Sequence, residues 1–433
     1  MTDLAEWLQR LESRNTETIR LGLERVGEVF ECLDATVGGT VITVAGTNGK
    51  GSVCAMLESI LLASGYSVGL YTSPHLLRYT ERVRLNGREV DEQALVDAFE
   101  AVESARGETP LTYFEHGTLA AWKVFCDAAP EVVILEVGLG GRLDAVNIVD
   151  ADCAIVTSVA MDHMNYLGHT RDKIGFEKAG VFRSGRPAIC GDPMPPESLL
   201  AHAEAIGASL WISGRDFGFG GDRQQWGYWR YEAPGSAGAL VKRGGLAYPA
   251  LRGANQLLNA ASVLTALELL RDRTPVSMQA VRQGLMLVEL PGRFQVLPGR
   301  PAVVLDVAHN PQAAGVLAEN LSNMGFFPET WCVVGMLADK DVEQVAGLLR
   351  GRVDHWYAAS LDGERGLDCK VLAARLRMAG VEAEACFESP AQAFDAARKA
   401  ADESDRIIVF GSFMTVADVL GFLEGEGKNN ARG

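Results

Sequence analysis

The chain lacks the sequence features that would place it in several common classes of protein. It has eight cysteines among 433 residues but no C-x-x-C pair, so neither a zinc cage nor a disulfide framework is predicted. Its first twenty residues are charged and contain no apolar segment typical of a secretory signal. No apolar run approaches the length of a membrane span. We therefore expect a cytoplasmic protein with reduced cysteines and no membrane partner.

The chain also has fewer positively charged than negatively charged residues. There are 40 lysines and arginines against 56 aspartates and glutamates, which gives a formal net charge of −16. Nucleic acids and anionic membranes repel a protein of this charge, so neither is expected as its main partner. An anionic substrate is not excluded, because a local group of donors can bind an anion on an acidic protein. The length of 433 residues predicts two or three domains.

Residues 41–52 carry the strongest local signal. The β-branched run at 41–44 predicts a buried strand, and the apolar spacing over 53–61 predicts a helix. A strand, a glycine turn and a helix N-terminus in this order present backbone N–H groups and the positive end of a helix dipole to an anion. Lys50 adds a mobile positive charge, and Ser52 adds a hydroxyl placed for a phosphate-bound Mg²⁺. We interpret the stretch as a cradle for a nucleoside triphosphate.

The alternative is a glycine turn without phosphate chemistry. Only two residues separate Gly46 from Gly49, whereas the general Walker A spacing has four. The lysine and the serine favour phosphate binding over this alternative.

Strand-like apolar runs alternate with helical segments along the rest of the chain. The predicted strands lie at 66–71, 132–135, 154–157, 302–306, 331–334, 355–359 and 406–410. This alternation predicts an α/β fold, with an N-terminal P-loop-type domain on a doubly wound, mostly parallel sheet and a smaller Rossmann-like C-terminal domain. Residues 3–33 are predicted to be helical, and residues 211–250, rich in Gly, Trp and Tyr, predict a β-rich excursion. A linker near residue 291 places the domains at 1–296 and 297–433.

Polar side chains follow several predicted strands of the first domain. Ser73, Glu136 and His163 each lie just past a strand, as the cradle does. Ligands of open parallel sheets bind beyond the carboxyl ends of the strands, and Mg²⁺ takes oxygen ligands that it shares with phosphates. This favours Glu136 as a metal ligand over a solvated strand-end charge. Taken alone, Ser73 fits an ordinary Ser-Pro turn, and His163 fits a structural role.

A series of motifs runs through nearly the whole chain. They are Gly46-Thr47-Asn48-Gly49-Lys50-Gly51-Ser52, Tyr71-Thr72-Ser73-Pro74-His75, Leu135-Glu136-Val137-Gly138-Leu139-Gly140-Gly141-Arg142-Leu143-Asp144, Glu177-Lys178-Ala179-Gly180, Asn255-Gln256, Pro291-Gly292-Arg293-Phe294, Asp306-Val307-Ala308-His309-Asn310-Pro311 and Phe410-Gly411-Ser412-Phe413. In this order they resemble the Mur ligase superfamily, and most of all its folate branch, the dihydrofolate synthase/folylpolyglutamate synthases.

The resemblance implies an ATP-dependent amide ligase. ATP phosphorylates a substrate carboxylate, and the amino group of L-glutamate attacks the acyl phosphate. In the folate branch the acceptors are dihydropteroate, which becomes dihydrofolate, and tetrahydrofolate polyglutamates. The expected cofactors are ATP and two Mg²⁺ ions, and a monomer is expected.

The resemblance also implies roles for individual residues. Lys50 and Ser52 hold the phosphates, together with the other cradle residues Gly46, Thr47, Asn48, Gly49 and Gly51. Ser73 and Glu136 hold one Mg²⁺, and Glu136 and His163 hold the second. In the C-terminal part of the chain, the residues implied in catalysis or nucleotide binding are Asn255, Arg293, Asp306 and His309.

Lys178 matches a family lysine that CO₂ converts to a carbamate, which replaces a cation with a carboxylate near the second metal. An ordinary lysine paired with Glu177 or a nearby acid is the alternative. Thr112, Phe114 and Asp144 match the pterin-side contacts of the bifunctional members. Phe114 also fits a helix core and Asp144 a loop cap, while Thr112 and Glu115 predict a helix-capping box.

Other functions compete with this interpretation. Within the superfamily, the chain is alternatively a folylpolyglutamate synthase only, or a peptidoglycan-precursor ligase that acts on UDP-linked substrates. Outside it, a nucleotide-dependent switch would turn over nucleotide without a small-molecule acceptor, and a dinucleotide oxidoreductase would bind NAD. Lys50, Ser52 and Glu136 argue against the oxidoreductase.

Overall fold

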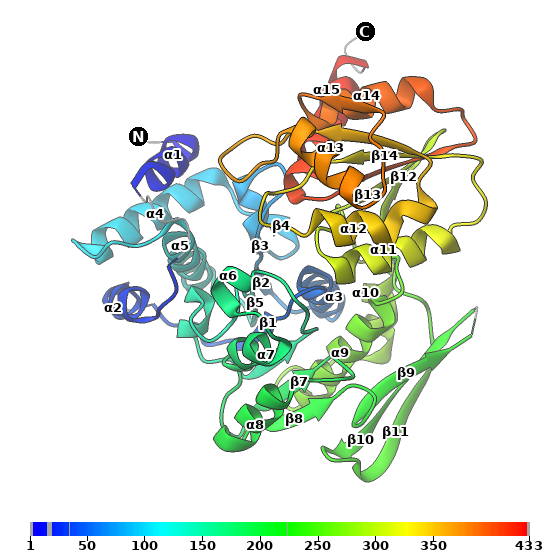
Figure 1. The fold of residues 1–433 in the computed structure, drawn as a ribbon. Coiled ribbons are helices and arrows are strands. Elements are labelled where there is room, and N and C mark those ends of the chain that lie inside the picture. Colours follow the sequence, from blue (N-terminus) through cyan, green and yellow to red (C-terminus); the bar gives the residue numbers. More distant parts are fainter. Residues whose placement is uncertain (1–2, 15–19, 34, 223, 431–433) are drawn as a thin grey trace. The chain divides into compact units, whose positions relative to one another are not determined.

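The computed structural model describes residues 3–14, 20–33, 35–222 and 224–430 (Figure 1). The chain divides into two compact units, of which the first comprises Met1–His75, Tyr79–Ala250 and Leu257–Val288, and the second Leu76–Arg78, Leu251–Gln256 and Glu289–Gly433. Each unit contains a largely parallel sheet, so the predicted α/β fold is confirmed.

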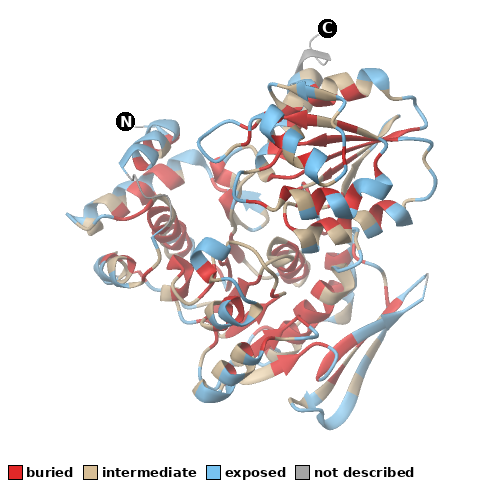
Figure 2. Cartoon of the chain, in the orientation of Figure 1, coloured by how far each residue is buried: buried red, intermediate tan, exposed pale blue. Residues whose placement is uncertain are grey.

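The sheet of the first unit has eight strands. They are β1 (Thr40–Ala45), β2 (Val68–Tyr71), β3 (Val83–Leu85), β4 (Arg88–Glu89), β5 (Val132–Glu136), β6 (Cys153–Val156), β7 (Pro187–Cys190) and β8 (Ser209–Ile212), in the order β4-β3-β2-β5-β1-β6-β7-β8. The strands from β2 to β8 in this order are parallel, whereas β3 and β4 form an antiparallel edge. Every residue of β1 and β5 is buried, which explains their continuous apolar sequence (Figure 2).

Helices and 3₁₀ turns precede, connect or follow these strands. They are α1 (Leu4–Arg14), α2 (Glu24–Leu33), α3 (Lys50–Ala63), α4 (Glu92–Arg106), α5 (Tyr113–Ala128), α6 (Met164–Leu167), α7 (Arg171–Ala179), α8 (Glu197–Ile206), α9 (Gln256–Leu269), α10 (Met278–Leu287) and the 3₁₀ turns η1 (Tyr79–Arg82) and η2 (Ala145–Ile148). The expected helix over 3–33 is wrong in part, because residues 20–23 are not helical and residues 15–19 lie outside the described residues. Gly22 has a φ of 145°, which a continuous helix cannot contain.

The predicted β-rich excursion is confirmed as a three-stranded antiparallel sheet. Its strands are β9 (Phe217–Gly221), β10 (Trp226–Ala233) and β11 (Ala237–Leu246). Trp226 and Tyr228 are buried, and the Tyr228 hydroxyl is 2.9 Å from Thr265 Oγ1 of α9. The excursion is thereby anchored to the helices of the first unit.

The second unit is built on a six-stranded sheet. Its strands are β12 (Gln295–Leu297), β13 (Ala302–Asp306), β14 (Thr330–Val334), β15 (His355–Ala359), β16 (Ala385–Phe387) and β17 (Arg406–Phe410), in the order β12-β13-β17-β14-β15-β16. The helices are α11 (Pro311–Asn323), α12 (Val342–Leu349), α13 (Cys369–Met378), α14 (Pro390–Ala400) and α15 (Phe413–Asn430), with the 3₁₀ turn η3 (Arg350–Arg352). The domain boundary that we expected at residue 296 falls inside β12, which pairs with β13. The last segment of the second unit begins earlier, at Glu289.

The cysteines are reduced in the structure, as their spacing in the sequence predicts. All eight thiols are free, and Cys54, Cys153 and Cys332 are buried as reduced core residues. Within the described ranges, no helix combines the length and apolar character needed to cross a membrane.

One histidine of the second unit joins the starts of three strands. His355, the first residue of β15, has Nδ1 2.7 Å from Glu384 Oε1 and Nε2 2.8 Å from Glu329 Oε2, and its ring stacks on Trp331 at 3.9 Å. Burial alone would lower the pKa of His355, but the two carboxylates raise it above its ordinary value. The protonated ring thus donates to both neighbours.

This raised pKa predicts a pH-dependent stability of the second unit. The protonated ring is the form that the carboxylates stabilise, so its contribution is complete below the unfolded pKa near 6.5 and is lost as the pH rises through the folded pKa. The loss is expected to be about 1 kcal/mol, because both carboxylates are half exposed. Urea unfolding from pH 5.5 to 8.5 measures it, with His355→Gln as the control. An equal pH dependence in that variant would contradict the assignment.

Candidate active site

The glycine-rich turn after β1 is held by the segment that follows β6. Thr47 N donates to Ser158 O at 2.8 Å, and Asn48 N donates to Ser158 Oγ at 3.0 Å. Thr157 Oγ1 donates in return to Asn48 O at 2.7 Å. The turn is therefore fixed by main-chain and hydroxyl contacts from the neighbouring strand end, which sequence reasoning did not foresee.

Two glycines of the turn are required by its geometry. Gly46 has a φ of 146°, and a Cβ there would lie 1.9 Å from Thr157 Oγ1. Gly49 has a φ of 93°, and a Cβ there would lie 2.8 Å from Asn259 Oδ1. Both conformations strain any residue with a side chain.

The N-terminus of α3 begins in this turn. Gly49 precedes it in a left-handed conformation and supplies no side-chain cap. Lys50 Nζ donates to Gly46 O at 3.1 Å, and Ser52 is buried. The turn therefore combines backbone N–H groups, a cation and a hydroxyl, which is the chemistry of a phosphate cradle.

Ser73 and Glu136 meet at the ends of neighbouring strands. β2 and β5 are parallel, with Tyr71 opposite Leu135, so the two residues lie at one edge of the sheet. Ser73 N donates to Glu136 Oε2 at 3.1 Å, and Glu136 is buried, with 5% of the residue exposed. A carboxylate and a hydroxyl beside a phosphate cradle are suitable Mg²⁺ ligands.

His163 follows β6 at the same edge and starts α6. Its backbone N–H donates to Asp162 Oδ1 at 2.8 Å, and its φ is 50°. Within the described part of the chain, no three His, Cys, Asp or Glu side chains are placed to hold a metal ion. An ion bound by Glu136, Ser73 or His163 would take further oxygens from phosphate and water, as Mg²⁺ commonly does. The residues fit a shared Mg²⁺ site and do not form an all-protein cage.

Lys178, near the end of α7, is buried and only 4% exposed. Burial, and after it the charge of Lys50, lower its pKa to about 7 against the opposing effects of Asp162 and Asp144. Lys178 does not pair with Glu177, because Glu177 forms its ion pair with Arg142 at 2.8 Å, and the nearby acids that act on the Lys178 charge are Asp162 and Asp144. Lys178 is therefore a partly neutral amine near the proposed phosphate and metal ligands.

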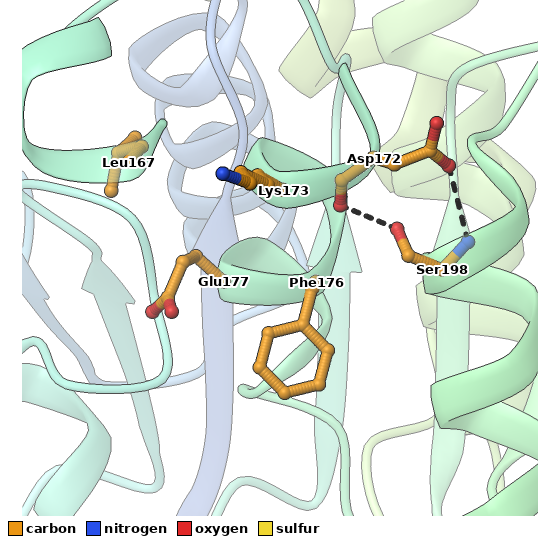
Figure 3. Close-up of a pocket in the computed structure, with 6 residues that line it drawn as sticks. All are labelled: Leu167, Asp172, Lys173, Phe176, Glu177 and Ser198. Carbon is orange, nitrogen blue, oxygen red and sulfur yellow. Dashed lines mark hydrogen bonds between the residues drawn. The ribbon is translucent and has the colours of Figure 1, made fainter. Parts of the chain in front are cut away.

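Glu177 lies instead on another side of α7, at a cavity of about 360 Å³ (Figure 3). The cavity is lined by Leu167, Asp172, Lys173, Phe176, Glu177 and Ser198. Ser198 Oγ donates to Asp172 O at 2.6 Å, which joins α8 to α7. None of the residues that we predicted for the site lines this cavity.

The predicted capping box at the start of α5 is confirmed. Glu115 N donates to Thr112 Oγ1 at 3.2 Å, and Thr112 N donates to Glu115 Oε2 at 2.8 Å. Phe114, in the first turn of this helix, lies 6.2 Å from the ring of Tyr71. A Cβ on Gly138 would come within 2.6 Å of the Phe114 ring, so the glycine leaves room for it.

Asp144 caps the short turn η2. Its Oδ1 accepts from Val146 N at 3.0 Å and its Oδ2 from Leu139 N at 2.8 Å. Burial raises the pKa of Asp144 to about 6, against the effect of these N–H groups. The loop-cap interpretation is therefore correct.

Three predicted residues of the second unit lie around the end of β13. Asp306 accepts from Ala308 N at 2.8 Å and from Phe294 N at 2.9 Å. Burial raises its pKa, while the Arg293 charge acts in the opposite direction. The Arg293 guanidinium lies 4.7 Å from the ring of Phe413, and His309 Nδ1 is 2.8 Å from Val307 O. Asn255 lies in the separate segment Leu251–Gln256 of this unit.

Comparison with known proteins agrees with this architecture. The Mur ligase middle domain matches residues 44–190, and the glutamate ligase domain of Mur ligases matches residues 292–413. The chain is 46% identical over 418 residues to the dihydrofolate synthase/folylpolyglutamate synthase of Escherichia coli (strain K12), with 96% of this chain and 94% of that protein covered.

Two solved structures are also similar. One is Escherichia coli FolC in complex with DHPP and ADP, with a TM-score of 0.91, 44% identity and 98% of both chains covered. The other is a bifunctional folylpolyglutamate synthase/dihydrofolate synthase with Mn, AMPPNP and L-glutamate bound, with a TM-score of 0.89, 45% identity and 98% of both chains covered.

A middle domain and a glutamate ligase domain in one chain are the parts of an ATP-dependent ligase of the Mur type. Because the similarity covers nearly the whole chain, it identifies one branch of this class of ligases. The chain belongs to the Mur ligase family, in its branch of dihydrofolate synthase/folylpolyglutamate synthases.

Proposed function

We propose that the protein uses ATP to add L-glutamate to dihydropteroate, which yields dihydrofolate, and to tetrahydrofolate polyglutamates. The observation that carries the proposal is the contact between Ser73 N and Glu136 Oε2 at the sheet edge that also bears the glycine cradle. A carboxylate suited to Mg²⁺ near a turn suited to phosphate supports an ATP-dependent ligase. The relatives named above carry both activities in their names.

The reaction requires one anion to approach another. The acceptor carboxylate takes the γ-phosphoryl group of ATP, and ADP leaves. The amino group of L-glutamate then attacks the acyl phosphate, and phosphate and a proton leave as the amide forms. Lys50, Ser52 and the N-terminus of α3 stabilise the phosphate charge.

We place one Mg²⁺ at Ser73 and Glu136 and a second at Glu136 and His163. Bound Mg²⁺ screens the two anions and stabilises the charge that develops during transfer. Glu136 is held by Ser73 N, so the carboxylate is oriented before any ion binds.

Lys178 is proposed to carry a carbamate. CO₂ adds to a neutral amine, and a pKa of about 7 keeps much of Lys178 neutral at physiological pH. The product is an anion near Asp162, where the second Mg²⁺ would offset the repulsion.

The remaining roles concern the acceptor and the nucleotide. We assign Thr112, Phe114 and Asp144 to the pterin side, with Phe114 stacked on the ring. In the second unit we assign Asn255 and Arg293 to the nucleotide, Asp306 to the ribose and His309 to the neighbourhood of the phosphates. We propose a cytoplasmic monomer whose first domain binds ATP and the folate acceptor and whose second domain, which includes β12, completes the ligase.

Phosphate release with ATP, Mg²⁺ and L-glutamate tests the function, with dihydropteroate compared against tetrahydrofolate. Turnover with both acceptors is the expected result. Turnover with tetrahydrofolate only would leave a folylpolyglutamate synthase. Turnover with neither acceptor, in buffer that supplies CO₂, would reject the folate assignment, and a UDP-linked acceptor would then test the other Mur-type ligases.

Asp144→Asn is expected to reduce turnover of dihydropteroate by at least about tenfold more than turnover of tetrahydrofolate. The amide nitrogen would replace one acceptor oxygen, either toward the pterin or toward Leu139 N. The ratio of kcat/KM for the two acceptors, measured on one preparation, is insensitive to a partial loss of folded protein. An equal loss for both acceptors would show that Asp144 acts as a loop cap alone.

A further inference from the structure

A single residue holds both ends of the turn that presents Ser73. β2 and β3 pair antiparallel as far as Tyr71 opposite Val83, and Thr72 N donates to the Arg82 carbonyl oxygen at 2.9 Å. At the other end of the turn, Arg82 Nε donates to His75 Nδ1 at 2.8 Å. Ser73 and Pro74 are the residues between these two bonds.

The Arg82 side chain is itself held in place. Arg82 is 9% exposed, and its guanidinium lies 5.1 Å from the ring centroid of Tyr79 and 5.6 Å from that of Tyr113. The two rings meet edge to face at 6.0 Å. A planar guanidinium against aromatic faces donates in fixed directions, which a lysine ammonium does not reproduce.

The position of this turn orients two proposed metal ligands, Ser73 and Glu136. Ser73 N donates to Glu136 Oε2, so the backbone position of Ser73 sets both its own hydroxyl and one carboxylate oxygen. The bond at Thr72 continues the β2–β3 pairing between main-chain atoms and does not depend on any side chain. The bond at His75 depends on the Arg82 side chain alone.

We infer that Arg82 is a positioning residue for the metal site, because its side chain fixes the Ser73 turn through His75. The inference rests on the proposed function, since it takes Ser73 and Glu136 as metal ligands. Contacts that orient a ligand from outside the metal site commonly change metal affinity about 10- to 100-fold when they are removed.

The test is Mn²⁺ binding by the full chain in the presence of AMPPNP, followed by electron paramagnetic resonance of free Mn²⁺. Arg82→Met is expected to weaken Mn²⁺ binding about tenfold, and Arg82→Lys is not expected to restore it. If only the charge of Arg82 mattered, its removal would strengthen Mn²⁺ binding. The predicted weakening is therefore opposite in sign to a simple charge effect. Arg88→Ala, an exposed arginine on β4, is the matched control and should bind normally.

A second pair of variants tests the same contact without altering Arg82. His75→Asn keeps an acceptor near the position of Nδ1 and should retain Mn²⁺ affinity, whereas His75→Phe should lose it. The double variant Arg82→Met/His75→Phe should be no weaker than either single variant, because both remove one contact. Circular dichroism verifies that each variant is folded.

Unchanged Mn²⁺ affinity in folded Arg82→Met or His75→Phe would overturn the inference, as would an equal loss in Arg88→Ala. Failure of the proposed function gives a different result. In that case the wild-type chain binds Mn²⁺ and AMPPNP but forms no glutamate amide.

Discussion

Glu136→Gln is expected to reduce glutamate ligation by roughly 10²- to 10³-fold with either acceptor. Glu136 is the last residue of β5, and its Oε2 accepts from Ser73 N. Glutamine keeps the length of the side chain and an oxygen for this bond, so the strand end should fold normally. The negative charge that binds Mg²⁺ is lost, and the repulsion between the ATP phosphates and the acceptor carboxylate is then screened less. Amide formation at saturating ATP measures the effect, and Mn²⁺ binding with AMPPNP should weaken in parallel.

The same strand provides a matched control for this substitution. Glu131, just before β5, accepts from Ser67 N at 2.9 Å, in the same way that Glu136 accepts from Ser73 N at the carboxyl end. Glu131→Gln removes one charge and retains one acceptor, but at the opposite edge of the sheet. Its activity should match that of the wild type. Full activity in Glu136→Gln, or an equal loss in Glu131→Gln, would remove Glu136 from the metal site.

The strands that the sequence predicted best are those buried on both faces. β1 and β5 are fully buried, so their apolar runs have no polar side to obscure the signal. The edge strands β3 and β4 were not predicted, because their pairing depends on β2 and not on an apolar pattern. β12 was not predicted for the same reason, since only its pairing with β13 makes it a strand.

The candidate site was predictable only where the sheet itself brings residues together. Parallel strands end at one edge, so Ser73 and Glu136 could be placed near each other before the structure was known. The side chain of Arg82 could not be assigned in this way, because nothing in its sequence context indicates a bond to His75. The pairing of Glu177 with Arg142 likewise depends on how the loop after β5 packs on α7.

Lys178→Ala is expected to reduce ligation by roughly 10²- to 10³-fold, provided that CO₂ is supplied to the wild type. Burial lowers the pKa of Lys178 to about 7 from an ordinary value of 10.5, so the neutral amine predominates above pH 7. Carbamylation therefore rises with pH through this range and replaces a buried cation with an anion that can support Mg²⁺. Removal of the side chain loses this anion, whereas acetate or formate added to Lys178→Ala is expected to restore part of the activity.

Lys173→Ala is the matched control, because Lys173 lies on the same helix but is exposed at the cavity on another side (Figure 3). It should retain wild-type activity and wild-type dependence on CO₂. The carbamate itself is measured by ¹³C NMR after equilibration with ¹³CO₂, and its signal should be present in Lys173→Ala and missing from Lys178→Ala. If wild-type activity is independent of CO₂ and the signal is absent, then Lys178 acts as a cation. In that case Lys178→Arg, which keeps the charge, should retain activity. If Lys178 is carbamylated, Lys178→Arg should instead lose activity, because a guanidinium cannot be carbamylated in the same way.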